Sequence, residues 1–174
     1  DSRAPDGPST LVAAQTDGRQ GTIKAIAHKT GIAVVQITAT KMLGTYGFLH
    51  GLFEVFARHR TVVDVVTTSE VSVSLTLEHP DPEPDLLADL ERLGAVVVER
   101  DRAIVCVVGD GLRDAPGIAG TVFDALRDIN IDLISQGASQ INLTFVVEAA
   151  RAPEVVRRVH AAVFARSPRA AVPA

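Results

Sequence analysis

The chain has 174 residues, of which 47% are apolar and 22% are charged. This length supports one large domain or two small ones, with a core that needs no disulfide or metal ion. The 17 basic and 21 acidic residues give a net charge of −4 without a long basic run, which argues against a nucleic-acid partner.

Membrane insertion and a disulfide framework are also disfavoured. No apolar stretch reaches the roughly 18 residues of a membrane span, and the start has no signal-peptide core. The single cysteine, Cys106, has no partner for an internal disulfide. We therefore expect a cytoplasmic protein that binds neither membrane nor nucleic acid.

The first predicted elements follow the order of a ferredoxin-like βαββαβ unit. Short apolar runs predict strands, and apolar residues three or four apart predict helices. In chain order we expect a strand at 31–40, a helix at 49–59, strands at 61–66 and 70–77, a helix at 84–94 and a strand at 95–100. Pro84 marks the start of the second helix, and Gly94 is expected at its C′ position.

The pattern then starts again. We expect a strand at 104–110, a helix at 116–129, strands at 131–137 and 141–148, and a helix at 152–165. A shift of 70 residues superposes the two copies without a gap; the pairs that coincide include Gly47 with Gly117, Phe53 with Phe123, and Glu78 with Glu148. This predicts a tandem repeat, the alternative being two unrelated segments with the same periodicities.

The second copy lacks its fourth strand, which would leave a sheet edge uncovered. One unassigned apolar segment, 22–28, can supply that strand. We therefore predict an α+β fold of two ferredoxin-like βαββαβ units, the first inserted into the second. The first unit covers 30–101, and the second combines 22–29 with 102–165. The expected flanks are a linker at 1–21 and a tail or linker at 166–174.

Catalytic and metal-binding motifs are absent from the sequence. There is no phosphate-binding loop, no G-x-S-x-G and no H-E-x-x-H. Cys106 lies within an apolar strand, which favours a small buried side chain over a nucleophile. The five histidines share no helical face and are expected at the surface: His28, His50, His59, His79 and His160. Asp81, Glu83 and Asp85 are expected in a solvated loop, with cation binding as the alternative.

The segment 41–49 is unusual for a loop that opens a helix. It is uncharged after Lys41 and contains two glycines near Thr45. Uncapped backbone N–H groups at a helix N-terminus suit a carboxylate ligand. The alternative is a loop packed under the neighbouring unit, with Thr45 as an ordinary N-cap.

A carboxylate in the next predicted strand suggests the other half of a site. Asp64 interrupts an apolar run, and hydroxyl groups follow at 67–69. We expect the second strand to lie beside the first, which would bring Asp64 near the 41–49 loop. A carboxylate there suits an ammonium group, so the two features together predict a site for a zwitterion with an extra positive charge. The alternative is an edge-strand residue that points to water.

These segments resemble a known family. MLGTYGFLHGLFEVFARHRTVVDVVTTSEVSVSLTLE, at 42–78, resembles the first ACT domain of aspartate kinases, particularly the lysine-sensitive class. ISQGASQINLTFVVE, at 134–148, resembles the matching segment of their second ACT domain, and STLVAAQ, at 9–15, resembles the end of the kinase domain. The likeness covers 9–165 and implies two ACT domains, one inserted into the other.

The resemblance implies feedback control by lysine of aspartate phosphorylation in lysine, threonine and methionine biosynthesis. Lysine would bind at an ACT–ACT homodimer interface, and the chain would restrain an attached kinase domain without catalysing. ATP and Mg²⁺ would belong to that kinase domain, so no cofactor is expected here. The residues implied for the carboxylate end are Met42, Thr45, Gly47, Phe48 and Leu49. Those implied for the ammonium end are Val63 and Asp64, with Thr68, Ser69 and Glu70 closing the site.

Two departures from the family pattern bear on this expectation. Gly44, Thr45 and Tyr46 stand where a more polar trio including Ser is expected, and Ile134 occupies the position that matches Asp64. The second unit is therefore expected to lack the site. Other readings are a sensor of threonine or another amino acid, and a structural dimerisation module. An RNA-binding pair needs exposed aromatic residues, and the central strands offer only Phe145.

Overall fold

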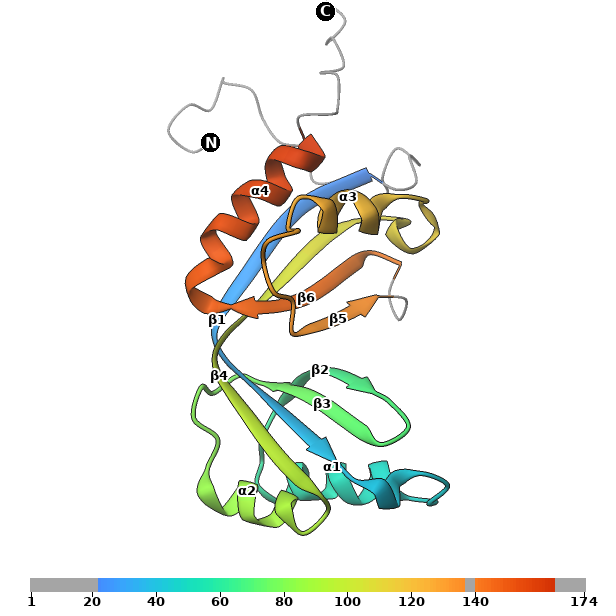
Figure 1. The fold of residues 1–174 in the computed structure, drawn as a ribbon, viewed down its shortest axis with the longest axis vertical. Helices are drawn as coiled ribbons and strands as arrows, with labels where there is room; N and C mark the ends of the chain where they lie inside the picture. Colours follow the sequence, from blue (N-terminus) through green and yellow to red (C-terminus); the bar gives the residue numbers. More distant parts are fainter. Residues whose placement is uncertain (1–21, 137–139, 165–174) are drawn as a thin grey trace, which may run out of the picture.

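The structure is a computed structural model that describes residues 22–136 and 140–164. Its centre is one antiparallel sheet in the order β2-β3-β1-β4-β6-β5 (Figure 1). The strands are β1 Thr22–Thr38, β2 Val63–Thr68, β3 Ser72–Leu77, β4 Ala95–Asp110, β5 Leu133–Gln136 and β6 Asn142–Glu148. The α-helices are α1 Phe48–Arg58, α2 Pro84–Glu91, α3 Ile118–Asp124 and α4 Ala152–Phe164. Short 3₁₀ turns are η1 Thr40–Met42, η2 Leu112–Asp114 and η3 Ala149–Arg151.

Strands β1 and β4 run through both halves of the molecule (Figure 1). The later part of β1 pairs with β3 and with the first part of β4, from Ala95 to Arg102. Its earlier part pairs with the second part of β4, which in turn pairs with β6. Each half thus has four strands and two helices, and the predicted α+β fold of two ferredoxin-like units is confirmed. The boundaries of the units and the insertion stay predictions, because β1 and β4 pass from one half to the other without interruption.

Each half has its own aliphatic core between its helices and the sheet. The first joins residues of α1, α2 and the sheet, including Leu52, Phe56, Leu75 and Leu86. The second is centred on the fully buried Phe145. The burial of these apolar side chains is the main stabilising contribution in each half, at about 1.5–3 kcal/mol per fully buried large apolar side chain.

The two halves meet where both long strands bend. Gly31 on β1 and Asp101 on β4 have left-handed backbones, with φ of 74° and 54°. They are 70 residues apart, so they are the same position in the repeat. The β1–β4 register shifts on either side of Ile32. A small apolar cluster joins the halves beside this bend, with Val34 from one and Val146 from the other.

Several elements differ from the sequence prediction. Residues 95–110 form one strand, because β4 pairs with β1 on both sides of an irregularity at 100–101 and resumes its pairing at Arg102, within the polar run that suggested a break. Helix α3 is shorter than 116–129, since the chain tightens into turns in which Leu126 and Ile129 bond to carbonyls three residues earlier. Strand β2 lies at the sheet edge, separated from β1 by β3, so the expectation that the second strand lies beside the first is wrong.

Candidate functional site

The connection between β1 and α1 leaves a helix N-terminus open. Gly44 and Gly47 adopt left-handed backbones, with φ of 69° and 80°. Gly47, and not Thr45, is the N-cap of α1, and no side chain caps the helix. Within the turn, the Thr45 N–H donates to the Met42 carbonyl at 3.2 Å. The uncapped first turn of α1 therefore presents backbone donors and the positive end of the helix dipole.

A hollow of about 320 Å³ lies at this helix start. Its lining contains Tyr46, His50 and all five residues that were predicted for the carboxylate end of a ligand. These five are Met42, Thr45, Gly47, Phe48 and Leu49. The lining is mostly apolar, and it includes the N-terminus of α1. A hollow of this size matches a small ligand with one anionic end and an apolar body.

An exposed apolar surface borders the hollow. Tyr46 is fully exposed, Leu43 is 63% exposed, and Leu49 and Phe53 are about 40% exposed. Leu49 and Phe53 are one helical turn apart on α1. Apolar side chains gathered in this way on an open surface are typical of an interaction site.

The residues predicted to close the site lie at the same end of the sheet as the loop. Thr68 is the last residue of β2, and Ser69 and Glu70 lie in the turn that leads to β3. The Ala39 N–H, at the start of the loop, donates to the Val71 carbonyl at 2.8 Å. The Ser69 hydroxyl is engaged within its own turn, 2.7 Å from the Ser72 hydroxyl.

Val63 and Asp64 lie at the opposite end of β2. Val63 pairs with Leu77, whereas Thr68 pairs with Val73 near the loop. Asp64 and Thr68 are four positions apart along the strand, a distance of about 13 Å. Within one copy of the chain, the structure therefore does not bring Asp64 to the helix N-terminus.

The Asp64 carboxylate faces a lysine of the same chain. Its Oδ2 is 3.9 Å from the Lys29 Nζ, and both side chains are partly exposed. The same ammonium forms an ion pair and a hydrogen bond with Glu78. This contact lowers the pKa of Glu78 and raises that of Lys29, mainly through the hydrogen bond between them.

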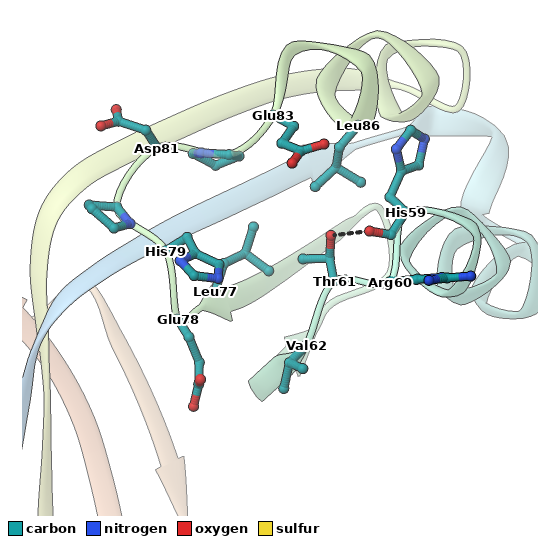
Figure 2. A pocket seen from close by; sticks show the side chains of 12 residues that line it. His59, Arg60, Thr61, Val62, Leu77, Glu78, His79, Asp81, Glu83 and Leu86 are labelled. Carbon is teal, nitrogen blue, oxygen red and sulfur yellow. Dashed lines mark hydrogen bonds between the residues drawn. The ribbon is translucent and has the colours of Figure 1, made fainter.

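A second hollow, of about 480 Å³, lies at the other end of the first unit. It is bounded by the α1–β2 connection at 59–62, by Leu77 at the end of β3 and by the β3–α2 connection at 78–83 (Figure 2). Figure 2 shows Thr61 below the start of α2, with its hydroxyl donating to the His59 carbonyl at 3.3 Å. The sequence analysis did not predict this hollow. Both connections lie at the same end of the unit, and this shared position in the predicted order of elements could have indicated it.

The second unit has a hollow of about 440 Å³ at the equivalent place. A shift of 70 residues carries lining residues of the first hollow onto those of the second: Arg60 onto Asn130, Val62 onto Asp132, Glu78 onto Glu148, and Asp81 onto Arg151. Because the side chains differ in charge and size at every pair except Glu78 and Glu148, the shared hollow is a product of the repeated fold and not of a shared chemistry.

The other residues considered as reactive groups are engaged in ordinary contacts. Cys106 is partly buried and accepts a hydrogen bond from the Thr144 hydroxyl at 3.5 Å. Asp81 forms an ion pair with Arg100 at 2.8 Å. Among residues 22–136 and 140–164, no group of three His, Cys, Asp or Glu side chains has the geometry of a metal site. Over the same residues, no helix is long and apolar enough to cross a membrane.

Comparison with known proteins gives a consistent set of relatives. The profile of the ACT domain family matches residues 105–163. The lysine-sensitive aspartokinase 3 of Escherichia coli K12 is 35% identical over 171 residues, covering 94% of this chain and 38% of that protein. The chain spans about a third of the length of the curated relatives it matches.

Two solved structures extend the similarity to the fold. Escherichia coli aspartokinase III, in complex with lysine and aspartate in its T-state, gives a TM-score of 0.79 at 36% identity, covering 94% of this chain and 38% of that one. A domain assigned as the C-terminal regulatory domain of aspartate kinase from Porphyromonas gingivalis W83 gives a TM-score of 0.71 at 32% identity. That match covers 80% of this chain and 96% of the other, so the likeness extends over nearly one whole regulatory domain.

Proposed function

This chain belongs to the aspartokinase family as an ACT regulatory region, and from this premise we propose that it senses free lysine and thereby inhibits an attached kinase domain. The observation that supports the proposal is the hollow at the start of α1, which is lined by all five residues expected for the carboxylate end. The similar aspartokinase III from Escherichia coli was crystallised with lysine and aspartate.

The hollow suits the amino-acid end of lysine. Its carboxylate would accept hydrogen bonds from the uncapped N–H groups after Gly47, where the helix dipole also favours a negative charge. Met42, Phe48 and Leu49 would pack against the methylene groups of the ligand.

The terminal ammonium group needs a carboxylate, and we assign Asp64 to it. Because Asp64 lies about 13 Å along β2 from the loop side of its own chain, we propose that a second copy supplies it. The exposed apolar residues beside the hollow, Leu43, Tyr46, Leu49 and Phe53, would be buried in such a homodimer. Val63 would flank the ammonium, and Thr68, Ser69 and Glu70 would close the site.

Inhibition follows if lysine binds one arrangement of the paired ACT domains better than another. A coupling free energy of about 1–3 kcal/mol would change the activity of the attached kinase several-fold to a hundredfold. The chain has no phosphate-binding motif, so ATP, Mg²⁺ and the transfer of phosphate to aspartate are assigned to the kinase domain. The cytoplasmic location expected from the sequence stays a prediction.

Calorimetric titration of the chain with lysine, threonine and methionine tests the proposal. We expect saturable heat with lysine, and an affinity reduced about tenfold to a hundredfold in Asp64→Ala, because a charge-assisted hydrogen bond to the ligand is lost. Asp81→Ala is the matched control, since Asp81 is an exposed carboxylate whose partner is Arg100.

The possible outcomes separate the alternative functions. Saturable heat with threonine or methionine, and none with lysine, would establish a sensor of another amino acid. No heat with any of the three would leave a structural dimerisation module. Equal losses in Asp64→Ala and Asp81→Ala would remove Asp64 from the site.

A further inference from the structure

Lys29 joins the two halves of the molecule at the carboxylate that we assign to the ligand. It lies on β1 just before the bend at Gly31, where its backbone pairs with Ile104 in the second half of the sheet. Its side chain reaches Asp64 and Glu78, which both belong to the first half. The chain thus places a primary ammonium, the same group that ends the side chain of free lysine, beside Asp64.

The two contacts of Lys29 are unequal. Glu78 is its hydrogen-bonded partner, whereas Asp64 lies at 3.9 Å, which is too far for a hydrogen bond. Asp64 therefore interacts electrostatically with Lys29, but its lone pairs are not used by the Lys29 ammonium and can accept hydrogen bonds. Because the Lys29 side chain is about half exposed, it can move between the two carboxylates without opening the core.

We propose that Lys29 is an internal competitor for the terminal ammonium of the ligand at Asp64, and that Glu78 sets the strength of this competition by holding Lys29 back. The inference rests on the proposed function. An incoming ammonium must share Asp64 with a charge of the same sign, so Lys29 weakens ligand binding. Glu78 offsets part of that repulsion and gives Lys29 a partner while the ligand is bound.

Affinity measurements on charge-changing variants test this assignment. In calorimetric titrations with free lysine, Lys29→Met is expected to bind about 1.5-fold to fivefold more tightly, the range that follows from the strength of an exposed ion pair. Lys29→Arg keeps the charge and should bind like the wild type. Glu78→Gln is expected to bind more weakly, because Lys29 then has Asp64 as its remaining partner.

Lys24→Met is the matched control. Lys24 is an exposed lysine on the same strand, and its replacement changes the net charge by the same amount. We expect it to leave the affinity unchanged. An affinity that is unchanged or lower in Lys29→Met, or raised equally in Lys24→Met, would overturn the role of Lys29 while leaving the lysine-sensor function in place. An absence of heat with the wild-type chain would overturn both.

Discussion

Gly94 allows close packing in this structure, whereas its position after α2 suggests a left-handed backbone. It follows α2, where the sequence predicts a left-handed C′ glycine, but it is absent from the positive-φ residues of the structure. A Cβ atom at Gly94 would instead lie 2.5 Å from the Thr38 carbonyl oxygen and 2.9 Å from the Ala39 Cβ. The absence of a side chain lets α2 approach the end of β1, where the loop of the candidate site begins.

Replacement of Gly94 by alanine is therefore expected to destabilise the chain. Since the contacts involve backbone that cannot turn aside, the free energy of unfolding should fall by about 1–3 kcal/mol in urea denaturation. Gly120→Ala is the control, because Gly120 is a helical glycine of α3 with open space around its Cβ position. That change should raise the free energy of unfolding by about 0.5–1 kcal/mol. Equal effects of the two substitutions would refute this account of Gly94.

At the residue scale, the sequence predicts the chemistry of the candidate site better than its geometry. The five predicted loop residues between Met42 and Leu49 line one hollow, because residues this close in sequence must also lie close together in space. The contact of Asp64 with Lys29 spans 35 positions, and neither residue type nor spacing encodes it. The alternative with Thr45 as the N-cap is wrong, because Gly47, with a left-handed backbone, occupies the N-cap position of α1.

At the scale of elements, α1 and α2 are linked by one carboxylate. Asp89 on α2 is 2.9 Å from the Nε2 of His59, which caps the end of α1, and 2.8 Å from Arg92. Arg58 lies 3.5 Å away. The hydrogen bond to His59 is the main cause that lowers the pKa of Asp89, and the two guanidinium groups act in the same direction. The ionised carboxylate therefore stabilises the packing of the two helices.

This lowered pKa predicts how stability depends on pH. Because the folded chain holds Asp89 ionised more strongly than the unfolded chain, its contribution is fully present above the ordinary aspartate pKa of 3.8 and is lost as the pH falls through the lower folded value. Asp89→Asn should lower the urea midpoint at neutral pH, and its difference from wild type should shrink as the pH falls below 3.8. Glu91→Gln, at an exposed position of the same helix, should have little effect at either pH. A difference for Asp89→Asn that is constant across the titration would contradict this role.

The order of the elements follows from the sequence, whereas their ends and neighbours do not. Period-2 and period-3.6 patterns predict the strands and helices of the two units in their observed order because each element buries one apolar face. The polar run at 100–102 suggested two strands in place of β4, because its side chains carry no apolar signal. The register with β1 shifts at this point, but β4 resumes its pairing with β1 and β6 at Arg102. The position of β2 at the sheet edge depends on pairing between distant segments, to which local pattern is blind.

At the scale of the whole molecule, the repeat explains the symmetry of the fold, and a difference in side chains between the two copies distinguishes their candidate sites. The left-handed residues Gly31 and Asp101 and the two hollows beside the α1–β2 and α3–β5 connections recur 70 residues apart. The carboxylate that we propose for the ligand does not recur, because Ile134 occupies the position of Asp64 in the second unit. We infer that one unit senses and the other supports it, joined by the bend that Lys29 spans.

The most direct test of the lysine-sensor account is an NMR titration of the chain with free lysine, followed through backbone amide signals. The account predicts saturable shifts of the amides at 44–50, where the N-terminus of α1 would bind the ligand carboxylate, and smaller shifts near Asp64. Saturable shifts confined to the hollow at 59–62 and 77–83, or no shifts at any lysine concentration, would contradict it.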